Sequence, residues 1–398
     1  MKSLRGYIQS IAGELSGLAG RAVRILRRPQ KSRSPLADHL LADALRLAEI
    51  PSPTDREERR AAFVQERLKS LGISPRVDPD GNVLAWIHPE TPSDEPPLLL
   101  FADLGSRRWH PLESLSRLDA EFARGAGLAD ILGAAALLSL AEGLQAPGTE
   151  KRRGLLLLFA ARCGDDPADK LFVPFIEKPA ERPFAALGVR GLLLGTLTTQ
   201  PRGTCRMEIS LSPERPSGRG TAAPSAVVDA LLSVAGRLSG ITWDSGGLTR
   251  LYIRRIEAVT TFGRCPTEAV MDVELESSDG ALMEMAVNTV KATVENSGSP
   301  GIRVDLQIRS GVPVGDAALS GKLMNTVQGI MKEQRIKIAE DQGADISAFF
   351  SSRGIPALSL GIALGEEGRE QDAIEINSIE RGRRLLETII LRLIGGER

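Results

Sequence analysis

Four short stretches of almost purely apolar residues constrain the fold of this chain most. They span residues 98–102, 154–161, 191–194 and 355–362. Runs of this length without alternating polar residues suit β-strands that are covered on both faces. A segment rich in Ala and Leu, residues 128–144, lies between the first two runs and predicts a helix. Strands that alternate with helices indicate an open α/β sheet.

The middle of the chain has a different pattern, in which apolar and polar residues alternate. This alternation predicts strands with one buried face, and segments of helical periodicity separate them. The predicted order is βαββαβ, the ferredoxin-like arrangement. We therefore expect a small domain, residues 205–312, inserted into a larger α/β domain made of residues 35–204 and 313–398. The alternating stretches are residues 207–211, 251–253, 269–275 and 302–308.

The first 33 residues are basic, with eight positive charges and one negative charge. Apolar residues recur at spacings of three and four from Leu4 to Ile25, which predicts an amphipathic helix. With the linker that follows, residues 1–34 are expected to form a unit of their own. The helix could pack on its own domain, on a partner helix, or on an anionic membrane surface. It lacks the uninterrupted apolar core of an export signal, so we expect a cytoplasmic protein.

Composition excludes several classes of protein. The formal net charge of −1 argues against a nucleic-acid partner. Three cysteines are too few, and odd in number, for a disulfide scaffold. The chain has no CxxC or HxxxH pair of a zinc finger and no run of about 18 apolar residues that would span a membrane.

Motifs in the larger domain occur in an order that is hard to obtain by chance. Residues 50–54 are Ile-Pro-Ser-Pro-Thr, residues 80–83 Asp-Gly-Asn-Val, and residues 125–130 Gly-Ala-Gly-Leu-Ala-Asp; residues 343–356 contain Gly-Ala-Asp, Phe-Phe and Arg-Gly-Ile-Pro. Together they resemble the dinuclear zinc exopeptidases and deacylases, the family of peptidase T, carboxypeptidase G, acetylornithine deacetylase and succinyl-diaminopimelate desuccinylase. The resemblance covers residues 36–398. It implies a zinc-peptidase α/β domain with a lid domain that often mediates dimerisation.

The resemblance also assigns the metal ligands, and most of them are missing. A zinc pair needs about five His, Asp or Glu ligands. The aspartate that bridges the two zinc ions is present, as Asp130. The first ligand, a His two residues before Asp103, is replaced by Phe101. Cys163 stands at the position of the catalytic glutamate, and Gly164 stands at that of the neighbouring glutamate ligand. Thr196 replaces a further Asp or Glu ligand, and Gln371 replaces the last His ligand.

Three substrate-binding positions of the lid are changed as well. The oxyanion-binding His, an Asn and the Arg that binds the substrate carboxylate align with Pro216, Gly263 and Glu276. The last of these reverses the charge. We therefore expect no cofactor, and zinc only if the site has been rebuilt.

Several residues leave alternatives open. Asp130 is a metal ligand or a structural aspartate that caps the helix after it. Asp103 is a relic that once oriented a metal-bound His or a solvated turn residue. Cys163 is an inert thiol or a nucleophile activated by His110. The acidic cluster Asp165, Asp166 and Asp169 is either a displaced metal site or part of a solvated loop.

Three hypotheses for the function follow. In the first, the protein has lost metal binding and catalysis and acts in binding or scaffolding, with a peptide-like or amino-acid-like ligand and a homodimer formed through the lid. In the second, it is an active peptidase or amidohydrolase with a rebuilt site, which uses Cys163 or a displaced metal set. In the third, it is a peripheral membrane or complex-assembly protein that acts through residues 1–33.

Overall fold

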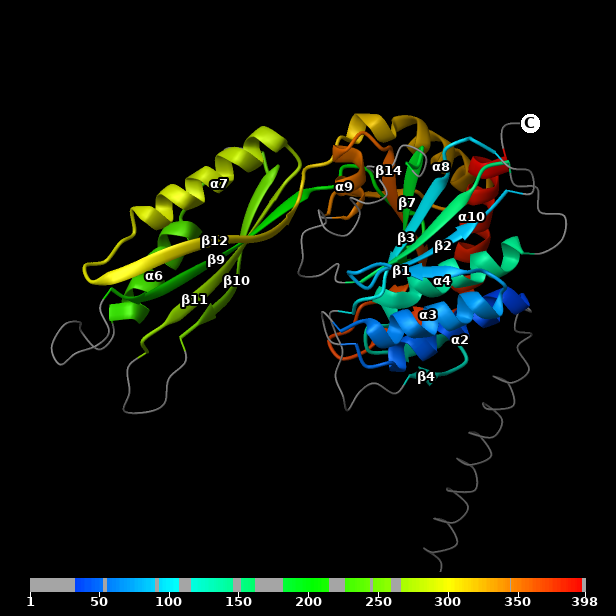
Figure 1. The fold of residues 1–398 in the computed structure, drawn as a ribbon, viewed down its shortest axis with the longest axis horizontal. Helices are drawn as coiled ribbons and strands as arrows, with labels where there is room; N and C mark the ends of the chain where they lie inside the picture. Colours follow the sequence, from blue (N-terminus) through cyan, green and yellow to red (C-terminus); the bar gives the residue numbers. More distant parts are fainter. Residues whose placement is uncertain are drawn as a thin grey trace, which may run out of the picture.

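Two lobes make up the molecule, joined by two neighbouring segments (Figure 1). We call residues 203–312 the small lobe and the other described residues the large lobe. The computed structural model describes residues 33–52, 56–89, 93–106, 116–145, 152–161, 182–214, 226–243, 246–258, 266–343 and 345–395. The helix predicted within residues 1–34 and most of the linker after it lie outside these ranges.

An eight-stranded mixed sheet, in the order β1-β2-β6-β3-β7-β14-β8-β13, forms the centre of the large lobe. Its central strands β6, β3, β7 and β14 are parallel, while β1, β2 and β8 run antiparallel to a neighbour. The apolar runs of the sequence become the central strands because both of their faces are covered. The strands are β1 Pro75–Val77, β2 Val83–Ile87, β3 Leu98–Asp103, β6 Leu155–Ala160, β7 Ala185–Leu192, β8 Thr196–Thr198, β13 Ala339–Asp341 and β14 Ala357–Ala363.

The strand predicted at residues 191–194 has wrong bounds. Strand β7 begins at Ala185 and ends at Leu192. The next residue, Leu193, has a φ of 65°, a left-handed conformation that breaks an extended strand. The strand predicted at 154–161 matches β6, and the run at 355–362 matches β14 to within two residues.

Helices cover the large sheet, and the one predicted at residues 128–144 is α4, Leu128–Leu144. It packs on β3 and β7, and nearly all of its apolar residues are buried, as expected for a helix that is covered on most sides. Helix α2 begins after Ser34, whose hydroxyl accepts a hydrogen bond from the Ala37 amide. The other helices are α2 Pro35–Glu49, α3 Glu58–Ser70, η1 Ala317–Ser320, α8 Gly321–Glu333, α9 Ser347–Ser352 and α10 Ile376–Gly395.

Two hydrophobic clusters lie on opposite faces of strand β3. Leu98, Leu100 and Ala102 belong to the cluster that includes α4. Leu99 and Phe101 point to the other face, into a cluster with residues of α9. This alternation is the period of a strand, and it decides that Phe101 faces α9.

A smaller antiparallel sheet, in the order β15-β16-β5-β4, lies near the start of α4. Its strand β16 follows a tight turn and carries the buried Asp372 at its first position. The strands are β4 Arg117–Leu118, β5 Phe122–Gly125, β15 Gly365–Glu366 and β16 Asp372–Glu375.

The small lobe has the predicted βαββαβ order and a four-stranded antiparallel sheet, β10-β11-β9-β12. Helices α6 and α7 pack on one face of this sheet around a separate apolar core. This arrangement confirms the predicted fold class, an α/β domain with an inserted ferredoxin-like domain. The elements are β9 Gly203–Pro213, α6 Ala226–Ser239, β10 Thr249–Glu257, β11 Ala269–Ser277, α7 Gly280–Glu295 and β12 Ile302–Val312.

Among the described residues, none of the helices has both the length and the hydrophobicity that a membrane span requires.

Candidate functional site

A cavity of about 170 Å³ lies between the lobes, at the carboxyl ends of β3 and β7. Strands β9 and β12 of the small lobe close its other side. Ligands of open α/β sheets bind outside the carboxyl ends of the strands, so this is the expected place for a site. Four charged side chains line it: Asp103, Arg190, Arg206 and Asp345. The other lining residues are Phe101, Ala102, Gly188, Val189, Thr204, Val312, Ile346 and Ser359.

Phe101, at the position of the first metal ligand, is packed into the apolar core beside this cavity. Its side chain is 4% exposed, and its ring centroid lies 5.1 Å from that of Phe350. Gly188 on β7 leaves the room for this ring, because a Cβ there would lie 2.7 Å from the ring and 2.2 Å from the Ser359 hydroxyl. The phenyl ring of Phe101, unlike an imidazole, has no lone pair to offer a metal. Phe101 therefore fills and shapes the site.

The large lobe orients two opposite charges at the cavity. The Arg190 Nη1 donates to Asp341 Oδ2 (2.9 Å) and to the Thr198 hydroxyl (3.2 Å). Asp345 Oδ1 accepts hydrogen bonds from the Ser359 hydroxyl (2.7 Å) and the Ser347 amide (2.8 Å). These partners fix both side chains before any ligand arrives, which lowers the entropy cost of binding.

The small lobe contributes Arg206, which belongs to a network of ion pairs on the sheet face. Its Nε donates to Glu274 Oε2 (2.8 Å), and Arg254 binds the other oxygen of the same carboxylate. Burial raises the pKa of Glu274, but the hydrogen bonds from Arg206 and Arg254 outweigh it, so this pKa is lowered overall. Glu276, the position where the resemblance predicts an Arg, lies 3.9 Å from the Arg254 Nη2. Its reversed charge is thus part of the same network.

Asp130, the retained ligand position, does not cap the helix that it was expected to cap. It is the third residue of α4, and its Oδ2 accepts a hydrogen bond from the Ser106 hydroxyl (3.2 Å). The helix N-terminus is capped by Asp372 of β16, whose Oδ2 accepts from the Ala129 amide (3.0 Å). The N-cap residue of α4 is thus Gly127 and not Asp130, and a strand far away in the sequence holds an amide of its first turn.

The remaining predicted residues do not gather at the cavity. Thr196 opens β8 opposite Ala339, and Gln371 lies in the turn before β16; neither lines the cavity. Asp103 does line it, at the end of β3, where the sequence placed it. Outside the described residues lie Cys163, Gly164, Pro216 and Gly263, together with His110, Asp165, Asp166 and Asp169.

The described residues do not fit a zinc pair. Within them, no three His, Cys, Asp or Glu side chains come close enough together to hold a metal ion. His39 pairs with Glu142 on the surface (2.9 Å), and His88 stacks on Trp86. A zinc pair needs several convergent anionic or imidazole donors, which the described residues do not provide.

Sequence reasoning missed several polar residues that line the cavity, above all Arg190, Arg206 and Ser359. A signal for Arg190 was present, because it is the one charged residue in an otherwise apolar strand, Ala185–Leu192. Asp345 was part of the Gly-Ala-Asp motif but had no assigned role. Arg206 could not be linked to the site, since its approach depends on how the two lobes meet.

Solved structures of peptidases share this architecture. A di-peptidase from Saccharomyces cerevisiae aligns with a TM-score of 0.71 at 13% identity, over 91% of this chain and 97% of that one. A tripeptidase from Staphylococcus aureus aligns at 0.68 and 15% identity, over 90% and 99%. A dinuclear metal-binding peptidase of the M20 family from Bacillus subtilis aligns at 0.61 and 15% identity, over 90% and 99%. No protein-family model and no curated protein sequence matches the chain.

The chain thus has the fold of the dinuclear metallopeptidases, which confirms at the level of the fold the resemblance found in its sequence.

Proposed function

We propose that the protein binds an amino-acid-like or short peptide-like ligand in the cavity between its lobes and does not hydrolyse it through a zinc pair. One observation carries the proposal. The first ligand position is an aromatic ring locked in the core, and the cavity beside it is lined by two arginines and two aspartates. A site with fixed charges of both signs suits a ligand that carries both signs.

The ligand class follows from the cavity's chemistry. A carboxylate would pair with Arg190 and Arg206, and an ammonium group with Asp103 and Asp345, by charge-assisted hydrogen bonds. Apolar lining by Phe101 and other side chains suits an apolar side chain of the ligand. The volume of about 170 Å³ is below the roughly 300–1,000 Å³ of sites for drug-sized ligands, which favours a single amino acid or a peptide terminus.

Calorimetric titration with leucine, N-acetyl-leucine and leucinamide tests the proposal, because the two analogues each lack one charge. We expect leucine to bind best. Arg190→Met should weaken leucine and N-acetyl-leucine at least about tenfold, the loss of one charge-assisted hydrogen bond, and leave leucinamide unchanged. Asp103→Asn should weaken leucine and leucinamide instead.

The matched control is Arg303→Met, an exposed arginine of β12 that does not line the cavity. It should leave all three affinities unchanged. Two tightly bound zinc ions per chain in protein purified without chelator, with peptide hydrolysis that a chelator abolishes, would favour the active hydrolase instead. Chelator-resistant hydrolysis that is lost in Cys163→Ala would point to a rebuilt thiol site.

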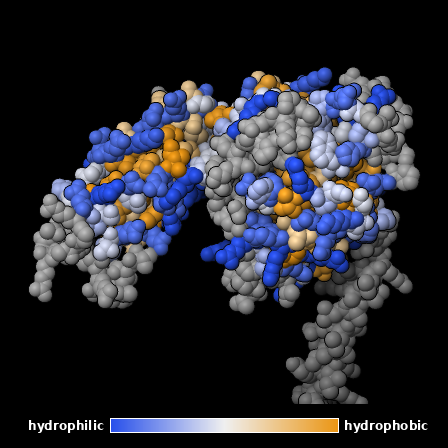
Figure 2. Space-filling model, in the orientation of Figure 1, coloured by the Kyte–Doolittle hydropathy of each residue, from blue (hydrophilic) through white to orange (hydrophobic). Residues whose placement is uncertain are grey.

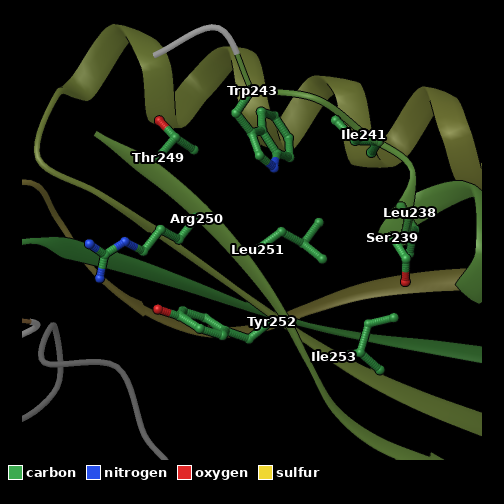
Figure 3. A pocket seen from close by; sticks show the side chains of 9 residues that line it. All are labelled: Leu238, Ser239, Ile241, Trp243, Thr249, Arg250, Leu251, Tyr252 and Ile253. Atoms are coloured by element: carbon green, nitrogen blue, oxygen red, sulfur yellow. The ribbon is translucent and has the colours of Figure 1, made fainter. Parts of the chain in front are cut away.

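We infer further that two copies associate through the small lobe. Strand β10 is the edge of the small sheet, and no other described strand pairs with its outer side. A groove beside it, between the end of α6 and the strand, is lined by Ile241, Trp243, Leu251 and Ile253 among others (Figure 3). Hydrophobic surface is visible on this lobe (Figure 2). Antiparallel pairing of two β10 strands would extend the sheet and cover the groove.

Light scattering after size exclusion tests this association. The wild type should have about twice the chain mass of 42.7 kDa, and Trp243→Arg should shift it to the monomer. Met285→Arg, at an exposed position of α7 (54%), is the control and should leave the mass unchanged. A wild type that stays monomeric at all concentrations would contradict the inference.

A further inference from the structure

A fully buried arginine lies beneath the loop that follows β3. Arg60, on α3, has 0% of its surface exposed. Its Nε donates to the Leu47 carbonyl (3.0 Å), and its Nη1 donates to the Leu104 carbonyl (2.8 Å). The Nη2 is buried and has no hydrogen-bond partner among the described residues. A guanidinium taken out of water in this way requires a counter-charge nearby.

Two carboxylates supply that counter-charge from neighbouring elements. Asp130 on α4 and Glu57, just before α3, both act on the charge of Arg60. Glu57 is 3% exposed, and a Cβ at Gly105 would lie 3.4 Å from its Oε1, so this carboxylate lies against the loop. The Ser106 hydroxyl, on the same loop, donates to Asp130.

The charge state of this cluster is maintained at neutral pH. Burial lowers the pKa of Arg60 to about 10, and the charges of Asp130 and Glu57 oppose that change. A guanidinium stays protonated near pH 7. The cluster therefore contains a permanent cation held between two acidic side chains.

We propose that Arg60 provides the positive charge that balances Asp130, a role that the resemblance gives to a metal ion. The guanidinium is anchored to the Leu104 carbonyl, two residues from the serine that holds Asp130. The arginine thus ties α3, α4 and the loop after β3 together without a metal. The neutralisation of Asp130 by Arg60 does not require any ligand in the cavity.

A double-mutant cycle on thermal unfolding, in buffer with chelator, tests the proposal. Arg60→Met should lower Tm by roughly 5–10 °C, because it removes the cation beside the buried carboxylate of Glu57 and the half-buried carboxylate of Asp130. Asp130→Asn should also lower Tm, although the side chains are nearly isosteric. The double variant should be more stable than Arg60→Met alone, because the uncompensated charge has gone with its partner.

Arg67→Met, which breaks a partly exposed pair with Asp43 and Glu142, is the control and should show no such rescue by Asp130→Asn. If Arg60→Met does not fold, recovery of folded protein in the double variant supports the proposal, and its failure contradicts it. Additive losses in the cycle would contradict it too. The proposal would also be contradicted if zinc, added without chelator, raised the Tm of the wild type and Asp130→Asn abolished this rise.

Discussion

Phe101 and Arg190 lie at or near the carboxyl ends of neighbouring strands, β3 and β7. The ring of Phe101 contacts Phe350, whereas Arg190 is held by Asp341 and Thr198. Neither a phenyl ring nor a guanidinium has a lone pair for a cation. At the scale of single residues, the end of the sheet that resembles a metal centre therefore carries an apolar contact and a fixed positive charge.

The residue-scale prediction is that restoring one ligand does not restore the metal site. Phe101→His should bind no zinc in a calorimetric titration, because Thr196 and Gln371 remain unable to act as anionic or imidazole ligands. It should also cost about 2–4 kcal/mol of unfolding free energy, since a polar ring replaces an apolar one in the core.

Phe101→Leu is the matched control, and it should cost no more than about 1.5 kcal/mol because it stays apolar. Tight zinc binding by the histidine variant would show that the other ligands are in place after all.

Helix α4 and strand β7 approach so closely that glycine is required on both. A Cβ at Gly133 of α4 would lie 2.1 Å from the Val189 carbonyl, and one at Gly191 of β7 would lie 2.0 Å from the Ala129 carbonyl. This contact positions two functional elements at once, since Val189 precedes Arg190 and Ala129 precedes Asp130. At the scale of elements, the site therefore depends on the spacing between a helix and a strand.

The prediction for this element is a contrast between two helical glycines. Gly133→Ala should lower the unfolding free energy in urea by about 1–3 kcal/mol or more, because backbone must move to admit the methyl group. Gly329→Ala on α8, where nothing lies within 4 Å of the added Cβ, should raise it by about 0.5–1 kcal/mol. Equal effects at the two positions would show that α4 and β7 are not in close contact.

Arg202 joins the two lobes at the scale of the whole molecule. Its guanidinium donates to the Gln342 carbonyl of the large lobe (2.8 Å) and, in the small lobe, to the carbonyls of Leu248 (2.9 Å) and Gly247 (3.1 Å). The residue is 3% exposed, so these bonds do not compete with bulk water. The clamp thus fixes the small lobe, which carries Arg206, against the large lobe.

The whole-molecule prediction is that Arg202→Met loosens the arrangement of the lobes. Small-angle scattering should show a larger radius of gyration and maximum dimension, because the two hydrogen bonds from Arg202 to the small lobe are lost together with the one that anchors it to Gln342. Arg303→Met, an exposed arginine on β12, should leave the scattering curve unchanged. A curve for Arg202→Met that overlays the wild type would show that the other contacts between the lobes suffice.

Part of the site could be predicted because it depends on local sequence. Asp103 at the end of an apolar run was placed correctly, since a run of buried residues fixes where a strand ends. The cap of α4 was predicted wrongly, because Asp372 reaches the helix from a strand 243 residues away along the chain. Arg60 showed no signal, since an arginine in a charged helical segment is normally exposed.

Hydrophobic patterning predicts most of the helices and strands and their order, and the sequence motifs alone show which residues stand at the positions that the resemblance assigns to metal ligands. Hydrophobic periodicity carries that information, because burial on one face or two is written directly into the spacing of apolar residues. Which charges meet depends on how the elements pack. Packing brings Arg190 and Arg206 to one cavity and sets Arg60 against the loop whose Ser106 holds Asp130. These electrostatic contacts depend on distance in space, which is set only when the helices and sheets have packed.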